Sequence, residues 1–252
     1  MTDISIAIVA FNNEEDVRNA VCSIQEHTAK IISKKIYIID NSTQKNHLKT
    51  LQSEEIVYIK TERNLGFGAG HNLILRELDS VYHAIINPDI LLREDSLFIL
   101  KEFVERENAM MAVPKILDED GTLQKSYRRD ITFVDLIFRR LPGSFGRKRK
   151  AHHTMQDMDF TKPFSVPFAH GCFYLIRTEI FLELNGFDPR FFLYMEDADL
   201  CRRVHEKGKL LYCPDTVVIH KWEKGSSKSK KLFWIHIRSM CSYFKKWGWK
   251  LW

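Results

Sequence analysis

Apolar strand patterns alternate with helical patterns along the first half of the chain. The runs "ISIAIVAF", "KIYIIDNS", "IVYIK" and "HAIINPDI" have the length and apolar content of buried strands. Between them, apolar residues at helical spacing predict helices from about Glu14 to His27, near Leu48, after Asn72 and from about Asp95 to Asn108. This repetition favours an α/β fold with a mostly parallel, Rossmann-like sheet and helices on both of its faces.

The second half of the chain has a mixed pattern. After "MMAVPKIL" and a turn at "DEDG", the apolar pieces "VDLIFRRL", "CFYLIR" and "LLYCP" are separated by turns. We expect this half to elaborate the same domain and to cover one edge of its sheet. No internal repeat occurs. The length of 252 residues suits one large α/β domain or two small ones packed closely, and we expect one domain at residues 1–227, followed by a distinct C-terminal segment at 228–252.

The C-terminal segment has the pattern of a basic amphipathic helix. From Lys224 to Trp252 it has eight Lys or Arg and no Asp or Glu. Such a helix suits peripheral binding to an anionic membrane surface, and the alternative is packing on its own domain or, in a homodimer, on a second copy. Gly248 interrupts the last turn. The apolar stripe consists of Phe233, Ile237, Met240, Phe244, Trp247 and Leu251.

Charge and cysteine content limit the class of protein. Removing those eight basic residues from the 38 Lys and Arg leaves 30, against 33 Asp and Glu, so the body is mildly acidic. The basic run "GRKRKAHH" is expected to be a solvated loop. Five cysteines without a Cys-x-x-Cys pair indicate reduced thiols, and the N-terminus lacks a signal-peptide pattern. With no apolar run of about 18 residues, we expect a cytoplasmic protein, and no nucleic-acid-binding module is recognisable.

Polar residues gather where the predicted strands end. In a parallel, doubly wound sheet the carboxyl ends of the strands share one edge, and ligands bind there. We therefore expect a small-molecule site at this edge. The residues concerned are Asn12, Asn13, Asp40, Asn41, Arg63, Asn64, Asn87 and Asp89.

The glycine-rich stretch "RNLGFGAGHN" allows two interpretations. Gly66, Gly68 and Gly70 could belong to a dinucleotide-binding turn, but the spacing lacks the third glycine of that fingerprint. The first strand-helix turn, "AFNNEED", where the fingerprint belongs, also has no glycine. The glycines could let backbone amides approach a phosphate or ribose, or could simply form a tight connection.

Taken in order, these pieces resemble a known enzyme family. "IAIVAFNNEEDVRNAVCSI", "YIIDNS", "RNLGFGAGHN", "INPDI", "GCFYLIRTEIFLELNGFDPRFFLYMEDADLCRRV" and "VVIHKWEKGSS" are similar to the inverting glycosyltransferases of family 2, which have a GT-A fold. The resemblance covers about residues 3–227 and is greatest to the bacterial rhamnosyltransferase-like branch, which builds surface polysaccharides. It implies a nucleotide-binding half at about 1–115 and an acceptor and catalytic half at about 116–227.

The resemblance also implies an activity. The chain would transfer rhamnose from dTDP-rhamnose to a hydroxyl of a glycan or of a polyprenyl-diphosphate-linked acceptor, with Mn²⁺ or Mg²⁺ as cofactor. A UDP-hexose-dependent enzyme is one alternative. A non-catalytic relative that only binds sugar or nucleotide is another.

Residue roles for the donor and the cation follow from the same resemblance. Asp89 aligns with the metal-binding acid of the family's Asp-x-Asp motif, with Asn87 in place of the first acid, and His220 aligns with a further metal ligand. Asp40 aligns with the acid that contacts the donor base, although an aspartate that caps a turn would look the same. A lone histidine after a strand can likewise be structural. The implied donor-binding residues are Phe11, Asn12, Asp40, Arg63, Asn64, Gly66, Gly68, Asn72 and Asn87.

The acidic cluster in "FFLYMEDADLCRRV" aligns with the catalytic base of the family. An inverting transfer needs a base for the proton of the acceptor hydroxyl, and Asp197 matches that position. An apolar wall of Phe192, Tyr194 and Met195, together with nearby carboxylates, is expected to raise the pKa of Asp197 while leaving it ionised at neutral pH.

The neighbours of Asp197 are assigned supporting roles. We expect Glu196 to hold an acceptor hydroxyl or orient the helix, and Asp199 to pair with Arg202 at i and i+3. The alternative is an acid-rich first helical turn that is favoured by the helix dipole alone.

Overall fold

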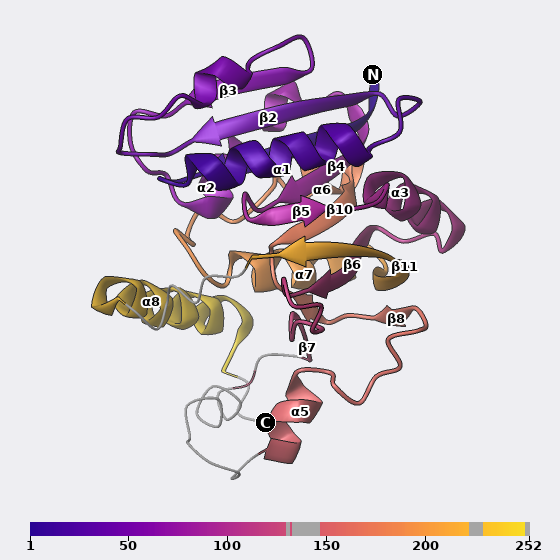
Figure 1. The fold of residues 1–252 in the computed structure, drawn as a ribbon. Helices are drawn as coiled ribbons and strands as arrows, with labels where there is room; N and C mark the ends of the chain where they lie inside the picture. Colours follow the sequence, from indigo (N-terminus) through magenta and orange to yellow (C-terminus); the bar gives the residue numbers. More distant parts are fainter. Residues whose placement is uncertain (130–131, 133–146, 222–228, 250–252) are drawn as a thin grey trace.

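The computed structural model describes all residues except 130–131, 133–146, 222–228 and 250–252, and among these described residues one large mixed sheet forms the centre (Figure 1). Its strand order is β3-β2-β1-β4-β10-β6-β11-β5, and β8 pairs separately with β11. The predicted piece "VDLIFRRL" and Leu251 of the predicted stripe lie outside the described residues.

The first half of the chain builds the parallel part of the sheet, as predicted. Strand β1 pairs in parallel with β2 and β4, and β2 pairs in parallel with β3. Their bounds are β1 Thr2–Ala10, β2 Lys34–Asp40, β3 Ile56–Lys60 and β4 Ser80–Ile86. Side chains of β1 alternate between the two faces, with Ile4, Ile6 and Ile8 in one core and Ala7 and Val9 in the other.

The second half does not merely cover an edge, which corrects the expectation from the sequence. Strand β10 (Phe173–Arg177) inserts into the centre and runs antiparallel to both β4 and β6 (Met111–Leu117). Strand β11 (Leu210–His220) is parallel to β6, and β5 (Ile90–Leu92) and β8 (Phe164–Ser165) are antiparallel to β11. Consequently β1, β2, β3, β4, β6 and β11 all point the same way. Their carboxyl ends share one edge.

Helices lie on both faces of the sheet, as predicted. Helices α1 (Glu14–His27) and α3 (Ser96–Arg106) pack on one face, and 3₁₀ turn η1 (Leu48–Leu51) adds Leu48 to that core. The other core includes residues of α6 (Thr178–Glu183), α7 (Glu196–His205) and α8 (Lys230–Trp247). A two-stranded sheet of β7 (Tyr127–Arg128) and β9 (Phe168–Ala169) lies beside the main sheet.

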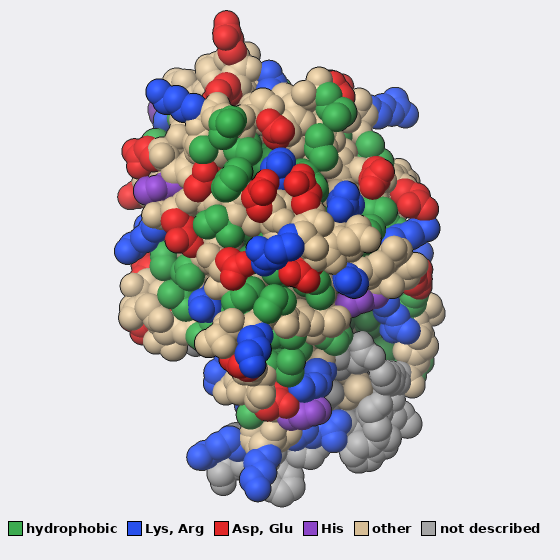
Figure 2. All heavy atoms as spheres, turned by 90° about the vertical axis from the view of Figure 1, so that its right-hand side faces the viewer, with side chains coloured by type: hydrophobic (Ala, Val, Ile, Leu, Met, Phe, Trp, Pro, Cys, Tyr) green, Lys and Arg blue, Asp and Glu red, His purple; other side chains and the backbone are tan. Residues whose placement is uncertain are grey.

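Two local predictions were wrong. The helix expected after Asn72 is instead α2 (Phe67–Asn72), which the glycine-rich stretch itself forms, followed by the 3₁₀ turn η2 (Leu75–Glu77). The run "GRKRKAHH" forms the short helix α5 (Arg147–His153) rather than a loop. Figure 2 shows Lys and Arg gathered at the end where α5 lies, whereas acidic and basic side chains are interspersed on the face that carries α3.

Helix α8 has a packed half and an exposed half. Ser239, Tyr243 and Phe244 are buried, whereas Phe233 and Trp234 are 38% and 68% exposed. The predicted apolar stripe is therefore covered by the chain's own domain only toward its C-terminal end. In the described part of the chain, no helix is both long enough and apolar enough to cross a bilayer.

Candidate active site

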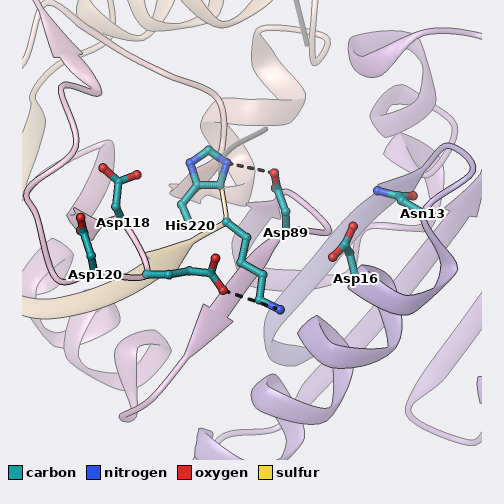
Figure 3. A pocket seen from close by; sticks show the side chains of 8 residues that line it. Asn13, Asp16, Asp89, Asp118, Asp120 and His220 are labelled. Atoms are coloured by element: carbon teal, nitrogen blue, oxygen red, sulfur yellow. Dashed lines mark ion pairs between the residues drawn. The ribbon is translucent and has the colours of Figure 1, made fainter. Parts of the chain in front are cut away.

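An open pocket of about 670 Å³ lies at the shared carboxyl edge of the sheet (Figure 3). His220 ends β11, and the β5 pairing places it opposite Ile90, next to Asp89. The His220 Nε2 lies 3.3 Å from the Asp89 Oδ2, and the Lys221 backbone N–H donates to the Asp89 carbonyl at 2.9 Å. The predicted pair of metal ligands thus comes together. The lining residues are Asn13, Asp16, Asp89, Asp118, Glu119, Asp120, His220 and Lys221.

The Asp89–His220 pair has the donor atoms that a divalent cation requires. His220 Nε2 and Asp89 Oδ1 are both buried and have no hydrogen-bond partner in the described structure. Within the described ranges no three His, Cys, Asp or Glu side chains converge on a single point, so Asp89 and His220 form a candidate pair rather than a larger set. This small set fits Mg²⁺ or Mn²⁺, which leave other coordination positions to phosphate oxygens and water. Burial lowers the pKa of His220, but Cys172 and Asp89 outweigh it and raise that pKa to about 10.

Acidic residues that the sequence reasoning missed form the rim of the pocket. Asp118, Glu119 and Asp120 follow β6 directly, and Asp16 lies in the first turn of α1. Lys221 reaches Glu119 at 4.0 Å. The available signal was the position of "DEDG" at the end of a strand, which we interpreted only as a turn. Because β6 is parallel to β4, the residues that follow β6 must lie at the same edge of the sheet as Asp89, which follows β4.

Asp40 is fully buried, and its carboxylate oxygens accept hydrogen bonds from other residues of the protein. Its Oδ1 accepts from the Ser42 N–H at 2.8 Å, and its Oδ2 accepts from Asn46 at 3.0 Å and from the Tyr58 hydroxyl at 2.7 Å. Burial acts to raise the pKa of Asp40, but these hydrogen bonds outweigh it and lower the pKa. The structure therefore favours the turn-capping interpretation over contact with the donor base.

Asn12 and Asn64, two of the predicted donor-binding residues, make hydrogen bonds within the loops at this edge of the sheet. Asn12 accepts from the N–H groups of Thr43 and Gln44, at 3.0 and 3.1 Å. Asn64 accepts from the Gly66 N–H at 2.8 Å. These contacts give the two asparagines a structural role, and donor binding by them stays a prediction.

Asn72 and Asn41 have positioning roles of the same kind. The Asn72 amide donates to the Phe187 carbonyl at 2.7 Å and accepts from the Phe187 N–H at 2.8 Å, and its predicted contact with the donor stays a prediction. Asn41 donates to the Gly66 carbonyl at 3.0 Å. Of the other predicted donor residues, Phe11 is 47% exposed, Arg63 is exposed, and Asn87 lies partly exposed in the turn before Asp89.

The glycines of α2 and its N-cap bring the helix against the segment that leads into α7. Gly66 has φ +86°, and a Cβ there would lie 2.1 Å from the Phe192 carbonyl oxygen. A Cβ at Gly68 would lie 2.7 Å from the Phe187 Cβ, and the Phe67 N–H donates to the Phe192 carbonyl at 3.1 Å. The close approach required here is to protein backbone and side chain. Contact of Gly66 and Gly68 with the donor stays a prediction.

Asp197 lies in the first turn of α7, after an unusual backbone turn. Tyr194 and Met195 both have left-handed φ, at +69° and +71°, an uncommon conformation for side chains of their size. The Asp197 Oδ1 accepts from the Ala198 N–H at 2.8 Å, and Oδ2 accepts from the Gly171 N–H at 3.3 Å. The turn and these amides fix the direction of the carboxylate.

The two adjacent carboxyl groups of α7 differ in their ionisation. Burial raises the pKa of Asp197, although the amides of Ala198 and Gly171 and the charge of Arg128 oppose the shift. Burial, and then the charge of Asp197, raise the pKa of Glu196 to about 8. The predicted direction for Asp197 is confirmed. Of the two, Glu196 is the group whose pKa lies above neutral pH.

The predicted pairing of Asp199 with Arg202 was wrong. Asp199 is fully buried and bonds to Arg203 at 2.7 Å, to Lys246 at 2.6 Å and to the Trp247 Nε1 at 2.8 Å. The Arg202 guanidinium instead lies over the Trp247 ring, 4.4 Å from its centroid. Both residues therefore join α7 to α8.

The predicted apolar wall is only partly formed by the expected residues. Met195 is buried, but Phe192 is 41% exposed. A Cβ at Gly171 would lie 3.2 Å from the Asp197 Cβ and 3.6 Å from Phe67. Phe67 of α2 therefore supplies part of the apolar surface next to the candidate base.

Comparison with known proteins decides the family. The family model described as glycosyl transferase family 2 matches residues 5–184. The chain belongs to this family. Most residues that line the pocket, including Asp89, lie within the matched residues, whereas Asp197 and His220 come after residue 184 in the sequence.

Relatives of this family 2 glycosyltransferase include rhamnosyltransferases. The chain is 30% identical over 193 residues to the rhamnosyltransferase WbbL of Escherichia coli K12, covering 72% of this chain and 70% of that protein. It is 26% identical over 238 residues to the N-acetylglucosaminyl-diphospho-decaprenol L-rhamnosyltransferase of Mycobacterium tuberculosis, covering 87% of this chain and 76% of that protein.

The structural comparison confirms the predicted GT-A fold. A crystal structure of GalNAc-T7 with UDP, GalNAc and Mn²⁺ superposes with a TM-score of 0.66 at 21% identity. The match covers 89% of this chain and 45% of the GalNAc-T7 chain, so the present chain spans less than half the length of that protein.

Proposed function

We propose that this family 2 glycosyltransferase transfers rhamnose, with inversion, from dTDP-rhamnose to a hydroxyl of a glycan or lipid-linked glycan, and that Asp197 is the catalytic base. The observation that carries the proposal is the pair of carboxyl groups at the start of α7, of which Asp197 is partly exposed and held by two backbone amides while Glu196 is buried. The rhamnosyltransferases among the relatives support the choice of sugar.

Asp197 takes the proton in the proposed step. As the acceptor oxygen bonds to the anomeric carbon, the bond from that carbon to the phosphate oxygen breaks and the nucleoside diphosphate leaves. The acceptor O–H proton passes to the Asp197 carboxylate, whose raised pKa makes it a stronger base than a free aspartate. The amides of Ala198 and Gly171 hold the carboxylate in place. A neutral Glu196 adds no competing charge and can donate a hydrogen bond.

Asp89 and His220 would hold the divalent cation. When bound, Mg²⁺ or Mn²⁺ neutralises charge that develops on the leaving diphosphate. The absence of a second acid at Asn87 favours a cation that binds with the nucleotide rather than before it. GalNAc-T7, with UDP and Mn²⁺ in its crystal structure, is a precedent for the fold.

A lipid-linked acceptor would place the enzyme at a membrane, and helix α8 has a surface suited to that. Trp234 is 68% exposed, and Lys230, Lys231 and Arg238 are exposed on the same helix. The name of the mycobacterial relative includes an N-acetylglucosaminyl-diphospho-decaprenol, a lipid-linked sugar. We propose peripheral contact between this half of α8 and anionic lipid, with self-association through α8 as the alternative. Sedimentation with vesicles that contain or lack anionic lipid distinguishes the two.

The test of the proposed function is calorimetric titration of the protein with dTDP-rhamnose and with several UDP-sugars, each with and without Mn²⁺ or Mg²⁺. Cation-dependent binding of dTDP-rhamnose supports the proposal. Binding of a UDP-hexose alone would favour the UDP-dependent alternative. Binding without turnover, with every acceptor tested, would favour a non-catalytic relative.

A further inference from the structure

The imidazole of His220 is held by one buried side chain, Gln124, which is only 4% exposed. The Gln124 Oε1 lies 2.9 Å from the His220 Nδ1, and the Gln124 Nε2 donates to the carbonyl oxygen of the same histidine at 2.9 Å. The same Nε2 donates to the Asp118 Oδ1 at 2.5 Å. The side-chain amide of Gln124 therefore hydrogen-bonds to both the ring and the backbone of His220, and also to Asp118 at the rim of the pocket.

The local fold brings Gln124 to this position. The chain turns at Asp118, whose N–H donates to the Thr122 carbonyl at 2.8 Å, and returns beside β6 through a bridge between Leu117 and Leu123. The Gln124 N–H then donates to the Ile116 carbonyl at 2.9 Å. Because β6 is the parallel neighbour of β11, this return places Gln124 next to the end of β11.

The contacts determine the orientation of the Gln124 amide. Its nitrogen faces two oxygens that can only accept, the His220 carbonyl and the Asp118 carboxylate. A flipped amide would place its oxygen against both of them, so the nitrogen must lie there. The Gln124 oxygen consequently faces the His220 Nδ1. An amide oxygen can only accept, so Nδ1 must carry a hydrogen.

This hydrogen determines what the other ring nitrogen can do. In the cation-free protein, the raised pKa of His220 keeps a proton on Nε2 as well, beside Asp89. A cation that binds there displaces this proton, and an imidazole whose remaining hydrogen is on Nδ1 then has a lone pair on Nε2. His220 Nε2 is the atom that lies 3.3 Å from Asp89 and has no hydrogen-bond partner in the described structure. Figure 3 shows the ring directed at Asp89. The lone pair therefore points to the position where a shared cation would bind.

We propose that Gln124 is a positioning residue that fixes His220 as the Nδ1–H tautomer, so that Nε2 is presented as a ligand to a divalent cation held with Asp89. The inference rests on the proposed function, because it assumes the cation of that site. Partners of this kind commonly contribute 10-fold to about 100-fold to metal affinity in proteins. Gln124 differs from Asp89 and His220 in that it never touches the cation.

The experiment measures Mn²⁺ binding to the full chain by water proton relaxation in the presence of dTDP, because the cation is expected to bind together with the nucleotide. No sugar donor is present, so no turnover occurs. We expect Gln124→Met to weaken Mn²⁺ binding by about 10-fold to 100-fold. The same substitution in a His220→Ala background should have almost no further effect, because Gln124 acts through His220. Unchanged Mn²⁺ affinity in Q124M, or an equal loss in both backgrounds, would overturn the inference.

One further variant and a second measurement keep the test decisive. Asp89→Asn removes a proposed ligand, so if D89N binds Mn²⁺ like the wild type, the proposed cation site itself is wrong, which is a different failure. If Q124M does not fold, the ¹⁵N chemical shifts of the His220 ring in the wild type, recorded with Mg²⁺ and dTDP, replace it, because the two tautomers differ in these shifts. A hydrogen on Nδ1 supports the positioning role, and a hydrogen on Nε2 contradicts it.

Discussion

Lys246 on α8 reaches the buried carboxylate of Asp199 on α7 at 2.6 Å, across 47 residues of sequence. The same ammonium group also contacts Asp188 at 2.7 Å, just before the turn that leads into α7. The Ser239 hydroxyl of α8 donates to the Leu193 carbonyl at 2.8 Å. Helix α8 is therefore attached at several points to the segment that carries Asp197. The C-terminal helix supports the candidate active site as well as exposing a surface.

Replacing Lys246 should destabilise the protein. In Lys246→Met, Asp199 stays buried with one cationic partner fewer, and we expect a loss on the order of 2 kcal/mol in the free energy of unfolding, measured by urea denaturation. The control is Lys245→Met, because Lys245 is the exposed neighbour. K245M should stay within about 0.5 kcal/mol of the wild type. Equal stabilities of K246M and K245M would show that the Asp199 contact contributes little.

The substitutions Asp197→Asn and Glu196→Gln should have different effects on kcat. In Asp197→Asn the acceptor proton has no base to receive it, so kcat should fall at least about 100-fold while calorimetric binding of the nucleotide is retained. In Glu196→Gln a group that is neutral at pH 7 is replaced by a neutral amide of similar size. Its kcat should change far less. Transfer by D197N at the wild-type rate would exclude Asp197 as the base.

The pKa of Glu196 makes stability depend on pH in a known direction. Burial and the Asp197 charge raise this pKa to about 8, whereas the ordinary value is 4.5. Between these values the folded protein keeps a proton that the unfolded chain has released, so the contribution of Glu196 is full below about pH 4.5 and is lost as pH rises to about 8.

Urea denaturation of wild type and Glu196→Gln across this range isolates the effect. The stability of E196Q relative to wild type should rise between pH 6 and pH 8.5, because only the wild-type side chain ionises. A difference that is constant over this range would mean that Glu196 is not neutral at pH 7.

The sequence predicted those features that depend on neighbouring residues and strand order. The alternating strands and helices predicted the bounds of α1, and strand direction placed Asp89 at the carboxyl edge of the sheet. The family resemblance added His220, which lies beside Asp89. The location of β10 between β4 and β6 could not be predicted, because pairing between strands that are far apart in the sequence leaves no pattern in the sequence of either strand. The partner of Asp199 was missed for a similar reason, since Lys246 and Trp247 come from a remote helix.

The glycines of the "RNLGFGAGHN" stretch illustrate the same limit. Sequence alone shows that small residues are needed, but it does not show what approaches them. The structure shows that Gly66 makes room for the Phe192 carbonyl and Gly68 for the Phe187 side chain, so that α2 and the segment before α7 are in direct contact.

Substituting Gly66 should therefore lower the free energy of unfolding by far more than the strain of its left-handed backbone conformation alone. Gly66 and Gly121 have nearly equal φ, +86° and +83°, but an added Cβ meets the Phe192 carbonyl at 2.1 Å in the first case and nothing within 4 Å in the second. Gly121→Ala should cost only the left-handed conformation, about 1–2 kcal/mol in the free energy of unfolding. Gly66→Ala adds displacement of the Phe192 segment and should lower both stability and kcat, since that segment leads directly into the turn before Asp197. Urea denaturation and turnover of both variants test this, and equal costs for G66A and G121A would mean that the contact between α2 and Phe192 is not a constraint on the active site.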